Sequence, residues 1–162
     1  MSRLDVFVAR MVSQRASLNH AAEMIKGKAG PAFAVGLGQW AHLQPHVRNH
    51  VRARDLHFRA RGRVPSRQHP PDDMLLLGDV HDTLPAALAR FGPVAQLIHT
   101  DLGGHDLVKN DAFARKISPL VEPLLANGGL MVASDRMYFD TLVEIPLPPD
   151  ASPEQWFIYQ RS

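Results

Sequence analysis

The stretch PAFAVGLG (residues 31–38) joins a short apolar run to a turn with two glycines. An apolar run of this length next to a turn signal is typical of a strand buried on both faces of a sheet. Glycine permits backbone conformations and close approaches that a side chain would obstruct. We therefore predict a strand over residues 31–36 that feeds a ligand-binding turn at Gly36, Leu37 and Gly38.

Helical and strand-like patterns alternate along the rest of the chain. The spacing of apolar residues predicts an amphipathic helix over residues 3–27. A start near Asp82 or Thr83 and a stop at Gly92 predict a helix over 82–91. A further helix is predicted over 110–129, kinked or divided at its prolines. Other strands are predicted at 74–79, 94–101, 130–135 and 156–161, the last at a sheet edge. This order predicts an α/β, Rossmann-like three-layer sandwich, with a mostly parallel sheet and helices on both faces.

Composition narrows the class of protein. The 162 residues are 45% hydrophobic and 21% charged, which suits one domain with a sizeable core. The absence of cysteine excludes disulfides and thiolate metal sites, and it favours a cytoplasmic location. We expect no signal peptide and no membrane span. The expected organisation is a single domain over 1–162, with an N-terminal helix within 1–29 and an aberrant segment at 39–69.

The aberrant segment has an unusual charge. Residues 39–69 hold seven Arg, five His and one Asp, whereas the remaining residues are net acidic. A basic block can mark a nucleic-acid surface, and His42, His46 and His50 have the spacing of metal ligands on a helix. Pro45 argues against that helix. We expect neither nucleic-acid binding nor a metal site.

Polar residues follow several of the predicted strands. The glycine turn at residues 36–38, Asp79, Asp101 and Asp135 all fall at predicted carboxyl ends. Ligands of open α/β sheets bind at that edge. The sequence therefore predicts a site there.

The stretch GLGQWA (residues 36–41) also fits the dinucleotide fingerprint G-x-G-x-x-G/A. That fingerprint needs an acid at the end of the next strand to hold the ribose. Asp55 instead precedes the apolar pair Leu56 and Phe58, at the start of the strand. A nicotinamide-dependent oxidoreductase therefore stays a less favoured alternative.

Three motifs carry a more particular resemblance. LGDVHDTLP (77–85), IHTDLGG (98–104) and LLANGGLMVASDRMYF (124–139), in this order after the glycine turn, resemble a small class I S-adenosyl-L-methionine-dependent methyltransferase of a short bacterial family. The resemblance covers residues 3–38 and 70–162. It implies methyl transfer from S-adenosyl-L-methionine to an acceptor that the sequence does not identify.

The resemblance also assigns roles to residues. The glycine turn would approach the methionine part of the cofactor, Asp79 and Val80 the adenine, and Asp135 and Arg136 the acceptor. The implied cofactor-binding set is Gly36, Leu37, Gly38, Asp79, Val80, Asp101, Leu102 and Gly103. The candidates for catalysis are Asp101, Asp135 and Tyr138, with His105 as a further candidate base. Gln14 and Arg15 on the first helix are further candidates for ligand contact.

Two departures from the family pattern stand out. Ala34 replaces an acid that precedes the glycines and orients the methionine amino group. Arg59-Ala60-Arg61 stands where an acid should end the second strand and hold the ribose hydroxyls. Synonymous codons for residues 39–69, read with one base dropped before Gln39, give the family's glycine loop as GLGNGRTY and, as REIYTFERA, a second strand that ends in an acid. We therefore hypothesise a compensating pair of frame changes around this segment.

These readings leave two main functions open. The first is methyl transfer, and the short chain favours either a small-molecule acceptor or a site completed by a second copy of the chain. The second is a non-catalytic relic of the same fold. Because Trp40 and the arginines of the second strand oppose the ligand, we predict that this sequence binds the cofactor weakly or not at all.

Overall fold

A computed structural model describes residues 2–36, 56–59, 75–102, 104 and 106–162. Seven strands in these residues form one sheet with the order β3-β2-β1-β4-β5-β7-β6. The strands are β1 (Ala32–Val35), β2 (Leu56–Arg59), β3 (Leu75–Leu77), β4 (Ala95–Thr100), β5 (Leu125–Ala133), β6 (Leu142–Ile145) and β7 (Phe157–Arg161). The helices are α1 (Arg3–Met24), α3 (Val80–Phe91) and α4 (Leu107–Val121), and a 3-10 turn, η3, covers Glu122–Leu124. The α/β, Rossmann-like prediction is confirmed.

The sheet is parallel except at its last pairings. Strands β1 to β5 pair in parallel, whereas β7 runs antiparallel to both β5 and β6. The chain order reverses at β1, which pairs with β2 on one side and with β4 on the other. A reversal of this kind opens a crevice at the carboxyl ends of the two strands, where ligands of such sheets bind.

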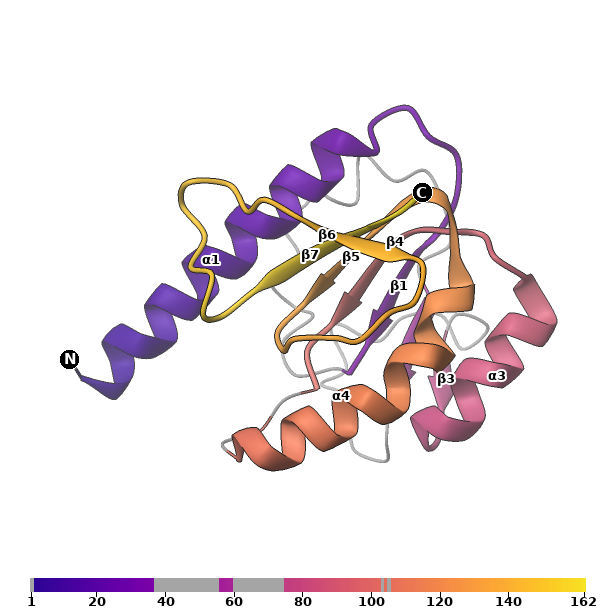
Figure 1. Ribbon diagram of the computed structural model, residues 1–162, viewed down its shortest axis with the longest axis horizontal. Helices are drawn as coiled ribbons and strands as arrows, with labels where there is room; N and C mark the ends of the chain where they lie inside the picture. Colours follow the sequence, from indigo (N-terminus) through magenta and orange to yellow (C-terminus); the bar gives the residue numbers. More distant parts are fainter. Residues whose placement is uncertain (1, 37–55, 60–74, 103, 105) are drawn as a thin grey trace.

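Helices cover both faces of the sheet, as Figure 1 shows: α1 lies on one face, and α3 and α4 lie on the other. Side chains alternate between the faces along each strand. Phe33 and Ile98 therefore join the core under α3 and α4, whereas Ala32 and Leu97 join the core under α1. Trp156 is fully buried beneath α1. No helix of the described residues is both long and apolar enough to cross a membrane.

Side-chain caps place the helix starts at the carboxyl edge. Ser2 and Asp5 form a capping box at the start of α1. Asp79 caps α3, so this helix starts at Val80 and not at Asp82 or Thr83. Asp106 caps α4 by accepting a hydrogen bond from the backbone N–H of Lys109.

The prediction for 110–129 is wrong at its C-terminal end. Helix α4 passes through Pro119 and ends at Val121, and β5 already begins at Leu125. The pairing of β5 with β4 shifts register between Ala95 and Leu97 of β4. Asn127-Gly128-Gly129 is therefore an irregular part of the strand and not a helix stop.

The far edge of the sheet also differs from the prediction. The last strand, β7, is not at the edge, because it lies between β5 and β6. The edge strand is β6, which the sequence analysis did not predict. Its four residues, LVEI, are at the lower limit of length for a strand pattern, and they show no strict alternation of apolar and polar residues.

Candidate functional site

The turn after β1 and the end of β4 are packed against each other. Gly36 has a φ of 85°, a conformation that favours glycine. A Cβ atom on Gly36 would lie 2.6 Å from the backbone oxygen of Asp101 and 2.5 Å from a methyl carbon of Leu102. The N–H of Asp101 donates to the carbonyl oxygen of Val35 at 3.1 Å. Glycine at position 36 is what lets these two segments meet.

An ion pair connects this point to α1. The guanidinium of Arg10 donates a hydrogen bond to the carboxylate of Asp101. The guanidinium also lies 5.4 Å from the centre of the Trp156 ring, and the indole N–H donates to the carbonyl oxygen of Arg10 at 3.2 Å. One indole therefore fixes both the backbone and the charged end of Arg10.

A second polar pair lies deeper beneath α1. The Gln14 amide donates to Nε2 of His99 at 3.1 Å, and the His99 ring stacks on Trp156 with centres 5.5 Å apart. Burial lowers the pKa of His99 to about 4, and the charge of Arg10 acts in the same direction while Asp101 opposes it. His99 is therefore neutral at neutral pH, and it supports α1 from within the core.

Asp79 lies at the start of α3 with its carboxylate largely exposed. It accepts hydrogen bonds from the backbone N–H of His81 at 2.9 Å and from the His81 ring at 2.7 Å. These bonds hold the pKa of Asp79 below its usual value. Its neighbour Val80 is buried and faces the core. An ionised, accessible carboxylate here suits the recognition of an exocyclic amine.

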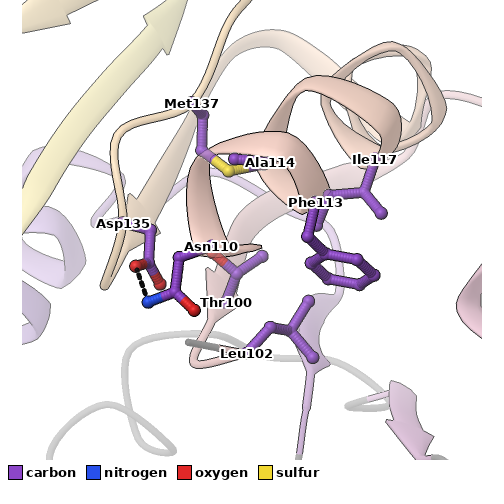
Figure 2. A pocket seen from close by; sticks show the side chains of 8 residues that line it. All are labelled: Thr100, Leu102, Asn110, Phe113, Ala114, Ile117, Asp135 and Met137. Atoms are coloured by element: carbon purple, nitrogen blue, oxygen red, sulfur yellow. Dashed lines mark hydrogen bonds between the residues drawn. The ribbon is translucent and has the colours of Figure 1, made fainter. Parts of the chain in front are cut away.

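A small pocket lies between the end of β4, the first half of α4 and the segment after β5 (Figure 2). The Asn110 amide donates to Asp135 at 2.9 Å and to the carbonyl oxygen of Gly104 at 3.0 Å, and the Ser134 hydroxyl donates to Asp135 at 2.8 Å. Asp135 is thereby fixed at one side of the pocket. The lining residues are Thr100, Leu102, Asn110, Phe113, Ala114, Ile117, Asp135 and Met137.

Tyr138 lies against α4. Its hydroxyl donates to the carboxylate of Asp111, and the guanidinium of Arg115 lies 3.8 Å from the centre of its ring. The bond to Asp111 raises the pKa of Tyr138. A phenol with a raised pKa and a fixed carboxylate partner is poorly suited to act as a base, and its catalytic role stays a prediction.

The structure brings together Gly36, Asp101 and Leu102 and places Asp135 across the end of β4. Leu37, Gly38, Gly103 and the candidate base His105 lie outside the described residues. Of the two α1 candidates, Arg15 is exposed and Gln14 is buried against His99. Arg10 and Asn110 were not predicted from the sequence. The only signal for Arg10 was its position one helical turn before the candidate Gln14, which places both side chains on the same face of the helix.

One departure from the family pattern, Arg59, lies at the end of strand β2. Phe58 pairs with Val35 and Arg59 pairs with Leu77, so Arg59 ends β2 next to the turn after β1. No Asp or Glu occurs from residue 56 to residue 71. The acid that the resemblance implies for a ribose is therefore absent from this end of β2. His42, His46 and His50 lie outside the described residues. The residues that the structure does describe hold no cluster of three metal-ligating side chains.

A sheet of this order, with a site at the carboxyl ends of β1 and β4, defines a cofactor-binding α/β protein of the Rossmann-like class. The chain matches the family of S-adenosyl-L-methionine methyltransferases over residues 1–161, and it belongs to that family. It is therefore an S-adenosyl-L-methionine-dependent methyltransferase by family.

A solved structure of high sequence identity agrees with this assignment. An S-adenosyl-L-methionine methyl transferase from Silicibacter pomeroyi DSS-3 is 52% identical, with a TM-score of 0.90 over 100% of this chain and 99% of that chain. The antibiotic-resistance methyltransferase Kmr is 15% identical, with a TM-score of 0.49 over 91% of this chain and 92% of that chain. Among curated proteins none matches the chain.

The described residues fit S-adenosyl-L-methionine at three points and depart from it at one. A Cβ on Gly36 would fill the space beside Asp101, Asp79 presents an exposed carboxylate, and Arg10 with Asp101 presents both charges. The sequence has Arg59 at the end of β2, where the resemblance implies a carboxylate.

Proposed function

We propose that the chain transfers a methyl group to a small-molecule acceptor that lies against the pocket between β4 and α4. The observation that carries this proposal is the fixed position of Asp135. Asn110 and Ser134 hold its carboxylate at one side of the pocket, while Phe113 and Met137 supply an apolar side. This arrangement suits an acceptor with an apolar body and one donor group, because the carboxylate orients the donor.

The residues act mainly by positioning. When bound, the cofactor supplies an activated methyl group, and the transfer is an in-line displacement that depends on orientation. Asp135 would accept a hydrogen bond from the acceptor and, where the acceptor must lose a proton, would receive it. Asp101 is a less favoured base, because Arg10 already pairs with its carboxylate.

The test is formation of S-adenosyl-L-homocysteine with a panel of small amines, phenols and thiols. Asp135→Asn should lower kcat about 100-fold or more with an acceptor that must lose a proton. The matched control is Asp140→Asn, which removes an exposed carboxylate from the segment between β5 and β6. Equal activity of both variants would contradict the role of Asp135.

The relic alternative is favoured by one observation, the lack of an acid at the end of β2. We propose that the sequence as it stands binds the cofactor weakly, and that residues 39–69 arise from two compensating frame changes. Sequencing of the source DNA from the codon for Gly38 to that for Pro71 tests the second statement. Frames that persist would favour a binding-impaired relic, whereas frames that vanish would favour an intact enzyme.

We also propose that the chain associates with a second copy. The first half of α1 exposes Leu4, Phe7 and Val8, with 69%, 44% and 50% of their surfaces accessible. Apolar groups gathered on one exposed helix often mark an interface. Light scattering after size-exclusion chromatography should give the mass of a dimer, and Phe7→Gln should lower it. A monomeric mass for the unaltered chain would contradict the proposal.

A further inference from the structure

The Arg10–Asp101 pair presents two opposite charges at the carboxyl edge of the sheet. It lies on the α1 side, because Arg10 belongs to α1 and its guanidinium lies against Trp156. The pocket with Asp135 lies on the other side, under α4. The end of β4 therefore separates a charged pair from the proposed acceptor pocket.

The pair is held firmly and stays accessible. The indole of Trp156 contacts the Arg10 guanidinium and donates to the Arg10 backbone. Asp101 is fixed through its own N–H, which donates to Val35. Even so, 32% of the Arg10 side chain and 12% of the Asp101 side chain remain exposed. A guanidinium has five N–H donors in a planar fork, so the bond to Asp101 leaves others for a second carboxylate.

We propose that Arg10 and Asp101 together bind the amino-acid end of the cofactor. That end is a zwitterion, with a carboxylate and an ammonium group on one carbon. Arg10 receives the carboxylate, because a guanidinium recognises carboxylates through paired hydrogen bonds. Asp101 receives the ammonium group. The inference rests on the proposed function, since it requires that this sequence binds the cofactor at the carboxyl edge.

The neighbouring residues support this division of roles. Among the described residues that end β1 and begin its turn, Ala34, Val35 and Gly36 carry no charged group. Asp101 lies directly beside this turn, because a Cβ on Gly36 would lie 2.6 Å from its backbone oxygen. The pair therefore places two charges beside the glycine turn.

The experiment compares two ligands that differ only in the amino-acid end. S-adenosyl-L-homocysteine carries it, and 5′-methylthioadenosine has a methyl group in its place. Isothermal titration calorimetry is made on the full chain and on Arg10→Ala, Arg10→Lys and Asp101→Asn. Arg90→Ala is the matched control, because it removes the same charge from the opposite edge, at the end of α3. Thermal unfolding of each variant reports whether it folds.

Arg10→Ala should weaken S-adenosyl-L-homocysteine binding about tenfold or more, since a lost hydrogen bond between charged groups has that effect. Its affinity for 5′-methylthioadenosine should stay unchanged, and Arg10→Lys should fall between. Asp101→Asn should likewise affect only the first ligand. A helix displaced by the substitution would weaken both ligands alike, and that result would overturn the inference. If the unaltered chain binds both ligands equally well, the inference fails while the cofactor site stands. If the unaltered chain binds neither ligand, the proposed function fails together with the inference.

Discussion

Gly36 offers a direct test of how the turn after β1 meets the end of β4. Gly36→Ala introduces a methyl group into a residue with a φ of 85°, at 2.5 Å from Leu102 and 2.6 Å from the backbone oxygen of Asp101. The left-handed conformation alone costs an alanine about 1–2 kcal/mol. Overpacking against a backbone atom adds about 1–3 kcal/mol, because Asp101 cannot move without breaking its bond to Val35. The free energy of unfolding should therefore fall by about 2–5 kcal/mol.

Gly27 is the matched control for this substitution. Its φ is 83°, and a Cβ there would meet no atom within 4 Å. Gly27→Ala therefore measures the conformational cost without the steric one, and it should lower the free energy of unfolding by about 1–2 kcal/mol. The difference between the two variants isolates the contact with Asp101 and Leu102.

Urea unfolding followed by tryptophan fluorescence is a suitable assay, because Trp156 is fully buried in the folded chain. The midpoint should fall further for Gly36→Ala than for Gly27→Ala, with the same dependence on urea. If the two variants lose the same stability within about 0.5 kcal/mol, the close approach of the two segments is not as described.

Three further predictions follow from other features of the chain. Arg59→Glu should strengthen S-adenosyl-L-homocysteine binding about tenfold, because a carboxylate at the end of β2 can accept hydrogen bonds from the ribose hydroxyls. Calorimetry measures this affinity, with Arg90→Glu as the control. An unchanged affinity would contradict the assignment of the end of β2 to the ribose. His99 is neutral when folded, with a pKa of about 4, so the unfolded chain binds more protons and stability falls as pH drops from about 6.5 to about 4. The loss from this group is about 3 kcal/mol, and His99→Gln should remove that part of the pH dependence of urea unfolding. Tyr159→Phe should lower the free energy of unfolding by about 1–3 kcal/mol in the same assay, because the Tyr159 hydroxyl accepts the buried N–H of Met137 at 3.0 Å; an unchanged midpoint would show that this bond adds nothing.

The sequence predicted the parallel half of the sheet well. Apolar runs that end in a glycine or an acid are strong signals, and they placed β1, β4 and their carboxyl ends correctly. The signal failed at Asn127-Gly128-Gly129, where residues typical of a helix stop instead form an irregularity within β5. Strand β6 was missed because its four residues, LVEI, form a short run without strict alternation of apolar and polar residues.

The candidate site was predictable where it depends on strand ends. Asp101 and Asp135 follow β4 and β5 as expected. Arg10 was not predictable, because its partner Asp101 lies 91 residues away in the sequence. Which residues of α1 face that partner depends on how the helix packs, and several faces of α1 carry polar groups. Asn110 was missed for the same reason, since its bond to Asp135 joins two separate elements.

The contact between Trp156 and Arg10 has a consequence for biosynthesis. It joins residues 146 positions apart, and the nearby bond from Ser152 to Ser13 spans 139 positions. A chain emerging from the ribosome makes α1 long before the indole that fixes it, which follows Arg10 by 146 positions. The wall of the site that α1 forms therefore stays incompletely packed until Trp156 has been translated. A nascent chain that stops before Trp156 should lack an ordered Arg10, however complete its parallel strands are.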